Sequence, residues 1–512
     1  MKYKNPIISG YNPDPSICRV GSDYYIVNSS FEYFPGVPVY HSKNLVNWEL
    51  LGHCLTTKEQ LLLENCRVSG GIYAPTLRYH DGWFFMTTTN VSSGGNFIVH
   101  SRRPDGGWSA PAWVDQEGID PSLLFDDDGK VYFVSTGMDE KRRACIRICE
   151  LNPFTGEKYT ESQILNYGCG GRYPEGPHMY KINGRYYLML AEGGTEYGHM
   201  ETMQRSDSPY GPYEPCPHNP ILSHRDDVGE KIYCTGHADI VEDGNGNWWM
   251  VCLAIRPCGG EDNRVLLHNL GRETFLTPLV WDEDGWPVAG EGGHIDLEME
   301  GALPGEVLPV CRDFSDDFSV PGFSHHYNFL RNPSMENYVR RTEENKLLLK
   351  GTQVTLNEEK SPVWLGVRQK GFETETTVKV YPKKRVQGMR GGITAFYNND
   401  YHYEIYITPE GNHWKVALAK HVHDIFAVTA AAEVRLPQDG GVYFRIVTDK
   451  EYYTFLYSTD GEQYQVLGSG STMGLCTEGT RRMTFTGTYL GMFAENGETE
   501  FENFTVKVLD GQ

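Results

Sequence analysis

Three acidic residues and one histidine stand at nearly the same distance before a segment that recurs along the chain. The recurring segments are rich in aromatic and β-branched residues and cover 23–27, 82–86, 130–134, 185–189 and 247–251. Ten or eleven residues before the second residue of each segment lie, in chain order, Asp14, Tyr73, Asp120, Glu175 and His237. Because equivalent positions of a repeat come together in space, Asp14, Asp120 and Glu175 are candidates for one shared site.

The chemistry open to three clustered carboxyl groups is acid–base catalysis. Carboxyls that share a site poor in water cannot all ionise at their ordinary pKa, so at least one is expected to stay protonated near neutral pH. A protonated carboxyl beside an ionised one meets the requirement for hydrolysing a glycosidic bond. The alternative is that an acidic residue before proline only caps a turn, as in Asp14-Pro15 and Asp120-Pro121. Three carboxyls in register with a repeat favour the functional interpretation.

The repeat also predicts the elements that position these residues. The recurring segments lie 59, 48, 55 and 62 residues apart, a spacing that suits one four-stranded blade of a propeller with enlarged loops. Turn residues lead into expected first strands at 16–20, 76–79, 122–125, 178–182 and 239–242. The first strand of each blade lines the central channel, so an all-β, five-bladed β-propeller would gather the three carboxyls at one mouth.

Composition limits the partners. A chain of 512 residues is too long for a single hydrophobic core, so two or more domains are expected. Its net charge of −22 (46 basic against 68 acidic residues) argues against nucleic acid and anionic membranes as binding partners. A neutral or cationic ligand suits this charge better, and together with the clustered carboxyls this makes a small neutral oligosaccharide the expected substrate. No apolar run is long enough for a membrane span and the first ten residues lack a signal-peptide pattern, so a cytoplasmic location is expected. The twelve cysteines are scattered along the chain, and we interpret them as reduced, mostly structural thiols. Homo-oligomer formation stays open.

Several motifs of the first 290 residues resemble glycoside hydrolase family 43. In chain order they are Asn5-Pro-Ile, Tyr11-Asn-Pro-Asp-Pro-Ser, Ser30-Phe-Glu-Tyr-Phe-Pro-Gly, Gly71-Ile-Tyr-Ala-Pro-Thr, Gly118-Ile-Asp-Pro-Ser, Tyr173-Pro-Glu-Gly-Pro-His, Thr235-Gly-His-Ala-Asp and Gly271-Arg-Glu-Thr. The resemblance implies a propeller that acts by inversion, with Asp14 as general base, Glu175 as general acid and Asp120 raising the pKa of the acid and orienting it. Inversion requires a water beside the base, so the carboxyls of Asp14 and Glu175 are expected roughly 6.5 to 9.5 Å apart.

The resemblance also implies two roles in the channel. His237 matches a histidine that contacts a metal ion such as calcium, directly or through water. A single imidazole is a poor calcium site because hard cations prefer oxygen ligands, and a hydrogen-bonding plug is the equal alternative for His237. Arg272 is expected to hydrogen-bond the substrate and to hold Asp14 ionised by its positive charge, against the alternative of a surface arginine after the last blade.

Further residues match substrate-binding positions of the family. Phe31, Phe34 and Tyr73 correspond to the walls of the terminal sugar subsite, although core packing explains each of them equally well. Tyr73 replaces a tryptophan of many β-xylosidases of the family, which leaves the terminal sugar open. Thr195 and Tyr197 follow the fourth recurring segment and are expected to line the site.

A second domain is expected after the propeller. We predict a propeller at 1–295, a Gly-rich and acidic linker at 296–309 and a two-sheet β-sandwich at 310–512, because strand and hairpin patterns fill the C-terminal third. The resemblance to family 43 implies that this sandwich is of the concanavalin-like type. In relatives this sandwich packs on the propeller and reaches the rim of the site. The segment 487–496 resembles the reaching loop, which makes Phe493 a candidate rim residue. Independent polysaccharide binding by the sandwich is the alternative.

Together these observations predict an exo-acting, inverting hydrolase that removes terminal pentoses from hemicellulose-derived oligosaccharides. The segments 29–52 and 193–199 most resemble the α-L-arabinofuranosidase branch, so that activity is favoured, with β-D-xylosidase as the second or dual activity. The alternatives are a sugar-binding propeller without catalysis and a retaining glycosidase.

Overall fold

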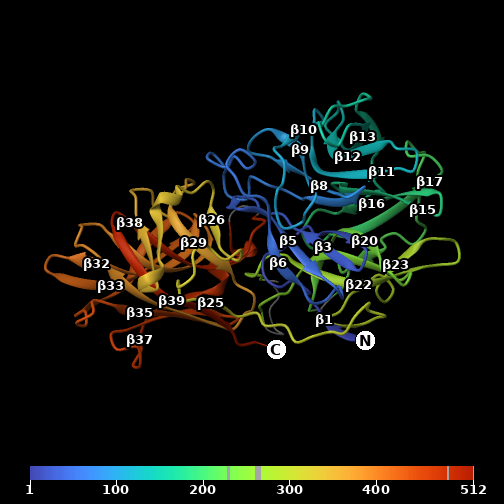
Figure 1. The fold of residues 1–512 in the computed structure, drawn as a ribbon. Coiled ribbons are helices and arrows are strands. Elements are labelled where there is room, and N and C mark those ends of the chain that lie inside the picture. The colour runs from blue at the N-terminus through green and yellow to red at the C-terminus, as the bar shows by residue number, and fades with distance from the viewer. Residues whose placement is uncertain (228–230, 260–266, 481–483, 511–512) are drawn as a thin grey trace.

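The computed structural model describes residues 1–227, 231–259, 267–480 and 484–510, and its regular secondary structure is almost entirely β-strand. Two bodies lie side by side, the first running from blue to yellow-green and the second from yellow to red in Figure 1. The helices of the described residues are short 3₁₀ turns, η1 (Met335–Asn337), η2 (Thr342–Glu344), η3 (Thr472–Leu475) and η4 (Thr477–Gly479). None of the helices in this part of the chain has the length and apolar character of a membrane span.

The first body is built from five antiparallel sheets that follow one another along the chain. Their strands are, in order, β2 (Ser16–Val20), β3 (Asp23–Val27), β5 (Gly36–Ser42) and β6 (Glu49–Leu55); β7 (Thr76–His80), β8 (Trp83–Asn90), β9 (Gly95–Ser101) and β10 (Ala112–Trp113); β11 (Ile119–Phe125), β12 (Val131–Met138), β13 (Ala144–Glu150) and β14 (Gln163–Asn166); β15 (Glu175–Ile182), β16 (Arg185–Glu192), β17 (Met200–Ser206), β18 (Glu214–Pro215) and β19 (Leu222–Ser223); and β20 (Tyr233–Glu242), β21 (Trp248–Ile255), β22 (Glu273–Trp281) and β23 (Pro287–Ala289).

These sheets form a closed ring, which confirms the predicted five-bladed propeller. The first strands β2, β7, β11, β15 and β20 neighbour one another in turn, and β20 returns to β2. The Ser16 hydroxyl donates a hydrogen bond to Asp239 across this closure (2.6 Å). The recurring segments of the sequence coincide with the second strands β3, β8, β12, β16 and β21. Their residues are aromatic and β-branched because neighbouring blades cover both faces of each sheet.

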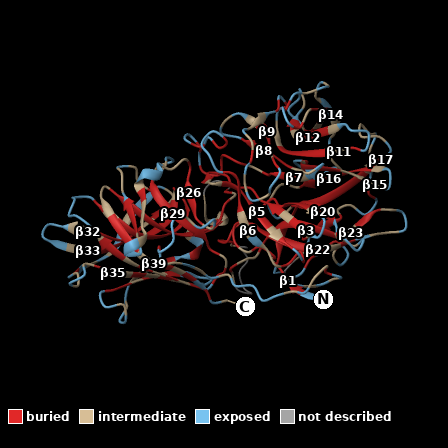
Figure 2. Ribbon diagram, in the orientation of Figure 1, coloured by how far each residue is buried: buried red, intermediate tan, exposed pale blue. Residues whose placement is uncertain are grey.

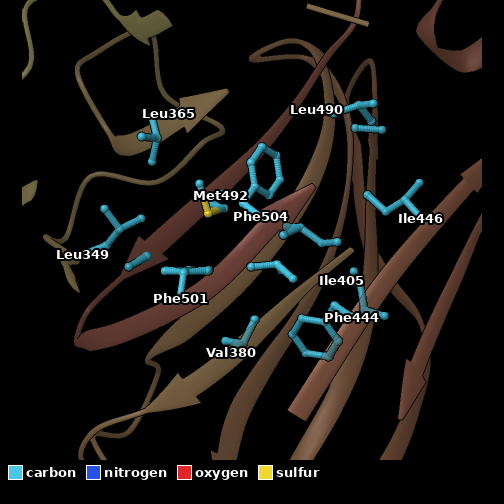
Figure 3. Packing of buried hydrophobic residues seen from close by; sticks show 14 of the residues in the cluster. Leu349, Leu365, Val380, Ile405, Phe444, Ile446, Leu490, Met492, Phe501 and Phe504 are labelled. Carbon is cyan, nitrogen blue, oxygen red and sulfur yellow. The ribbon is translucent and has the colours of Figure 1, made fainter. Parts of the chain in front are cut away.

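The second body is a β-sandwich, as predicted. One sheet has the order β27 (Tyr338–Arg341), β28 (Lys346–Lys350), β39 (Glu498–Val508), β30 (Thr374–Pro382), β35 (Val442–Thr448), β36 (Tyr452–Ser458) and β37 (Gln465–Ser471), with β25 (Phe314–Asp316) beside β39. The facing sheet has the order β34 (Ile425–Val434), β33 (His413–Val422), β32 (Tyr401–Glu410), β31 (Arg390–Asn398), β38 (Tyr489–Glu495), β29 (Val363–Arg368), β26 (Asn328–Leu330) and β4 (Tyr33–Phe34). Figure 3 shows their shared core, with Leu365 and Ile405 from one sheet and Phe444 and Phe501 from the other.

The two bodies are joined by backbone pairing and by buried polar contacts. The short strand β4 belongs to the propeller segment of the chain yet extends a sandwich sheet, pairing with β26. Arg331 of the sandwich is fully buried and donates to the Cys66 carbonyl of the propeller. The residues expected to form a linker include β24 (Glu298–Glu300), which pairs with β1 (Lys2–Lys4) at the N-terminus. Buried residues fill both bodies and the region where they meet (Figure 2).

Candidate active site

The propeller brings the predicted axial residues to the start of its innermost strands in a shared backbone conformation. Asp14, Asp120 and His237 have φ values of +51°, +55° and +46°, a left-handed conformation that is uncommon for residues with a side chain. Each of the three lies two residues before an equivalent ladder position, at Ser16, Ser122 and Asp239, which pair with Val27, Val134 and Val251. Ladder irregularities precede Ser122 and Asp239 and turn the backbone toward the channel.

Glu175 does not occupy quite the same position as the other two carboxyls. In its blade the equivalent ladder residue is His178, paired with Met189, so the left-handed position falls on Gly176, whose φ is +56°. A Cβ atom at Gly176 would lie 3.0 Å from Nε2 of His237. Glycine therefore leaves room for the imidazole, and the fourth blade presents its carboxyl from one residue earlier.

Asp14 is buried and held in its ionised form. Nη1 of Arg272 donates to its Oδ1 (3.1 Å), and the Ser29 hydroxyl donates to its Oδ2 (2.5 Å). Nδ1 of His237 lies 3.7 Å from Oδ1. Burial opposes ionisation, but the Arg272 guanidinium, His237 and the Ser29 hydroxyl hold the pKa of Asp14 below its ordinary value. Asp14 is therefore an ionised carboxylate that can accept a proton.

Asp120 and Glu175 have the opposite character. Burial raises the pKa of Glu175 to about 7, and the nearby Asp14 charge adds to this effect. Burial, followed by the charges of Glu175 and Asp14, raises the pKa of Asp120 well above its usual range. Oδ2 of Asp120 accepts the N–H of Gly176 (3.3 Å), which ties it to the backbone directly after Glu175. This pair of carboxyls therefore retains a proton near neutral pH.

Arg272 connects the base to both bodies of the molecule. It is buried, and besides Asp14 its Nη1 donates to the Thr195 hydroxyl (2.9 Å), while Nη2 donates to the carbonyl of Phe485 (3.2 Å). Its Nε atom is buried without a protein partner. The expected contacts of Arg272 with Asp14 and of Thr195 with the site are present, and the alternative of a surface arginine does not hold.

Aromatic rings lie against one side of this cluster. The rings of Phe31 and Tyr73 are 5.3 Å apart, and that of Phe485 stacks on Phe31 at 5.6 Å and meets Tyr73 edge-on at 5.9 Å. The Arg272 guanidinium lies over Phe31 and Phe485 at 5.8 and 5.4 Å. Phe31, Tyr73 and Phe485 of the sandwich thus form one aromatic group, and Arg272 lies over two of its rings.

Three of the residues predicted to bind substrate make packing or interdomain contacts in the structure. Phe34 is part of β4 and packs between the propeller core and the sandwich core, because its strand extends a sandwich sheet. Phe493 is fully buried within β38, since the segment predicted to be a loop is a central strand of the sandwich. Tyr197 is exposed and its hydroxyl donates to Glu478 of the sandwich (3.3 Å), so it bridges the two bodies.

Sequence reasoning missed Phe485 and Ser29. Phe485 comes from the opposite body of the molecule, and no periodic pattern in the sequence marks such a contact. Ser29 lies two residues after β3, the second strand of the first blade, and is separated from it by Asn28. Its side chain points into the channel, where it bonds Asp14. The strand-to-loop position after β3 is the one signal that could have indicated it.

The protein groups around His237 do not by themselves complete a calcium site. Calcium takes six to eight oxygen ligands, whereas the carboxylate next to His237 is Asp14, whose oxygens are engaged by Arg272 and Ser29. The nearby His199 is a second imidazole rather than an oxygen ligand, and its Nδ1 is 3.0 Å from the Cys234 carbonyl. Within the described residues there is no group of three or more His, Cys, Asp or Glu side chains placed to hold a metal ion.

A second polar layer lies deeper in the same channel. Asp239 is fully buried and accepts hydrogen bonds from Arg78 at 2.7 and 3.2 Å, from the Ser16 hydroxyl at 2.6 Å and from the Tyr180 hydroxyl at 2.6 Å. Nη2 of Arg78 also contacts Nδ1 of His178 (2.9 Å). Although burial opposes ionisation, Arg78 lowers the pKa of Asp239 to about 2. The network links the first, second, fourth and fifth blades around one satisfied ion pair.

Known proteins share this architecture over the whole chain. Residues 3–287 match Glycosyl hydrolases family 43, and residues 315–507 match the Beta xylosidase C-terminal Concanavalin A-like domain. A non-reducing end α-L-arabinofuranosidase of Bacteroides ovatus is 40% identical over 99% of this chain and 95% of its own length. A β-xylosidase of Bacillus subtilis is 33% identical over 91% of this chain and 90% of its own.

Solved structures of related proteins have the same two-domain fold. The structure of GH43B of the Bacteroides ovatus xyloglucan PUL superposes with a TM-score of 0.92 at 39% identity, covering 99% of this chain and all of that one. A xylan β-1,4-xylosidase of Bacillus halodurans superposes with a TM-score of 0.90 at 30% identity, covering 98% and 99%. With its axial carboxyls on a five-bladed propeller and a concanavalin-like sandwich docked beside them, the chain belongs to glycoside hydrolase family 43.

Proposed function

We propose that this glycoside hydrolase releases terminal α-L-arabinofuranose, and secondarily terminal β-D-xylose, from short hemicellulose-derived oligosaccharides, with inversion of the anomeric carbon. The observation that carries the proposal is the opposite protonation of two carboxyls in one site. Asp14 is held ionised by Arg272, while the pKa of Glu175 is raised to about 7. Such a separation of pKa values assigns a base and an acid.

The mechanism follows from these protonation states. A water beside Asp14 attacks the anomeric carbon and gives its proton to the Asp14 carboxylate. The bond from the anomeric carbon to the glycosidic oxygen breaks, and Glu175 donates its proton to that oxygen. Each turnover leaves Asp14 protonated and Glu175 ionised, and exchange with solvent restores both. Asp120, bonded to the Gly176 N–H, holds the backbone that carries Glu175 and disfavours a second negative charge beside it.

The proposal of exo action rests on the position of the sandwich. Phe485 lies against Arg272 and Phe31, and its N–H donates to the Ser69 hydroxyl (3.0 Å). One side of the site is therefore covered by the second body. A covered site favours the end of a chain over the interior of a polysaccharide, and it gives the sandwich a structural role.

The proposed sugar preference rests on the relatives. The Bacteroides ovatus relative is named as a non-reducing end α-L-arabinofuranosidase and the Bacillus subtilis relative as a β-xylosidase. The first is more similar to this chain, and Tyr73 stands where many β-xylosidases of the family have tryptophan. Dual activity is the second candidate, because both sugars are neutral pentoses with similar hydroxyl arrays.

The direct test is turnover of 4-nitrophenyl α-L-arabinofuranoside and 4-nitrophenyl β-D-xylopyranoside. We expect both to be hydrolysed, with a higher kcat/KM for the arabinofuranoside. A higher value for the xyloside would reverse the order of the two activities, and absence of turnover for both would support a sugar-binding propeller instead.

Stereochemistry is tested separately. Proton NMR of the first-formed sugar should show the anomer opposite to that of the substrate, which requires room for a water beside Asp14. A first-formed product with the configuration of the substrate would identify a retaining enzyme.

A further inference from the structure

A glycine-rich loop directly before Glu175 surrounds a buried acidic side chain of the same blade. The loop covers 168–174 and leads into β15, whose first residue is Glu175. The side chain is that of Glu192, the last residue of β16, which pairs with β15. Glu192 is fully buried. A side chain without exposed surface does not contact a substrate, so any influence of Glu192 on catalysis is exerted through other residues.

The carboxylate of Glu192 is hydrogen-bonded by the backbone of this loop. Its Oε2 accepts the N–H of Gly171 (2.6 Å), and its Oε1 accepts the N–H of Cys169 (2.7 Å). The Thr202 hydroxyl of β17 also donates to Oε1 (2.8 Å). Within the described residues, no basic side chain lies at ion-pair distance from Glu192. Because a buried carboxylate is costly unless its oxygens accept hydrogen bonds, the loop N–H groups take the place of a counter-charge.

Glycines allow the loop to approach this carboxylate closely. A Cβ atom at Gly171 would lie 2.7 Å from Oε2 of Glu192 and 2.6 Å from Cε of Met200. A Cβ atom at Gly168 would lie 3.0 Å from the same oxygen. Gly168 and Gly170 also have left-handed φ values of +83° and +109°, which residues with a side chain disfavour. The loop backbone can therefore close around Glu192 only with glycine at these positions.

The backbone between this anchor and Glu175 has an unfavourable conformation. Tyr173 has a φ of +53°, a left-handed conformation that a residue with a large side chain keeps only where its surroundings fix it. The carbonyl of Arg172 accepts the N–H of Gly193, the residue after Glu192 (2.7 Å). If these contacts were lost, the segment would relax and Glu175 would move with it.

Glu175 is thus held from both directions along the chain. On its C-terminal side, Oδ2 of Asp120 accepts the N–H of Gly176 (3.3 Å). On its N-terminal side the loop is anchored by Glu192, and Glu175 itself pairs with Ala191, the residue before Glu192. A general acid acts only within hydrogen-bond reach of the oxygen that it protonates, and a misplacement of about 1 Å is enough to lower the rate strongly.

We propose that Glu192 is a positioning residue for the general acid and places Glu175 by anchoring the loop 168–174. This inference rests on the proposed function, because it takes Glu175 to be the acid. Glu192→Gln keeps the shape of the side chain, but its NH₂ group is a donor and must face the N–H of either Cys169 or Gly171. In either orientation one loop N–H loses its acceptor, and the loop is released at that point.

The test compares a substrate whose leaving group needs protonation with one whose leaving group scarcely needs it. For Glu192→Gln we expect kcat to fall about 10-fold on an arabino-oligosaccharide and less than about 2-fold on 4-nitrophenyl α-L-arabinofuranoside. The matched control is Glu500→Gln, because Glu500 is an equally buried glutamate of the sandwich, bonded to Arg341 (2.6 Å) and Lys383 (2.7 Å). This control should lower Tm without a difference between the two substrates.

A double variant separates positioning from a purely structural role. In the Glu175→Gln background, Glu192→Gln should cause no further loss on the arabino-oligosaccharide, because the group that Glu192 positions is already absent. A full additional loss in the double variant would overturn the proposal. Equal losses on both substrates for Glu192→Gln alone, or no loss on either, would also overturn it. Equal losses for Glu175→Gln would instead contradict the proposed function itself, so the two failures are distinguishable.

A second variant displaces the loop while keeping Glu192. Gly171→Ala adds a methyl group where the loop meets the carboxylate, and it serves as the test if Glu192→Gln does not fold. We expect the same selective loss of kcat on the arabino-oligosaccharide. An equal loss on the aryl arabinofuranoside would show that the loop does not act through the acid and would overturn the proposal.

Discussion

The two polar layers of the propeller channel are built from the same strands and behave in opposite ways. In the deeper layer, the carboxylate of Asp239 is matched by Arg78, Ser16 and Tyr180, and its pKa is lowered to about 2. In the layer at the mouth, the carboxyls outnumber the one guanidinium, and the pKa of Glu175 rises to about 7. A satisfied ion pair holds the blades together, whereas an excess of carboxyls supplies a proton at neutral pH.

The largest effect is expected from the base. Asp14→Asn keeps the size of the side chain but removes the proton acceptor, so kcat should fall by about 10³-fold or more on every substrate. The matched control is Asp239→Asn, the same change in the deeper layer, which should retain catalysis in the folded protein while lowering stability. Similar losses of activity in the two variants would contradict the division between the layers.

The acid should show a smaller and substrate-dependent effect. Glu175→Gln cannot donate a proton, and we expect a loss of about 10²-fold to 10⁴-fold on arabino-oligosaccharides. Aryl glycosides with acidic phenols need little protonation and should lose far less. Steady-state kinetics on both substrate types measures the difference, and equal losses would remove Glu175 from the role of acid.

In the deeper layer the expected effect is on stability. Arg78→Met leaves Asp239 buried without its counter-charge, which should cost about 3 to 5 kcal/mol in the free energy of unfolding. Urea unfolding monitored by tryptophan fluorescence measures this loss. The pH dependence of the remaining activity should keep its shape, because Arg78 does not contact Asp14 or Glu175 in the described contacts. A shifted pH profile would show that the layers are coupled.

The smallest effect concerns the ring contributed by the sandwich. Phe485→Ala removes the stacking on Phe31 but keeps the backbone contacts to Ser69 and Arg272, so KM should rise about fivefold, equivalent to about 1 kcal/mol. The control is Phe426→Ala, which removes a partly exposed phenylalanine of β34 on the sandwich surface. Equal KM values for Phe485→Ala and the unchanged enzyme would show that the sandwich does not contribute to substrate binding.

The propeller and its carboxyls could be predicted because the repeat leaves a strong local signal. The second strand of each blade is buried on both faces, which forces aromatic and β-branched residues at regular intervals. The displacement of Glu175 by one residue could not be predicted, since ladder irregularities leave no mark in the spacing. The contacts between the two bodies could not be predicted either, because strand patterns do not reveal which sheet a segment joins. Phe485 was therefore not identified, and Phe34 and Phe493 were assigned to the sugar site although they lie in strands of the sandwich sheet.

The pH profile of kcat/KM on an arabino-oligosaccharide tests the central claim most directly. Asp14 acts ionised, so activity should fall only as the pH drops toward its lowered pKa, and Glu175 acts protonated, so activity should fall as the pH rises through about 7. In Glu175→Gln, measured on an activated aryl arabinofuranoside, the alkaline fall should disappear while the acid fall remains. An alkaline fall near pH 7 that persists in Glu175→Gln would contradict the assignment of Glu175 as the acid.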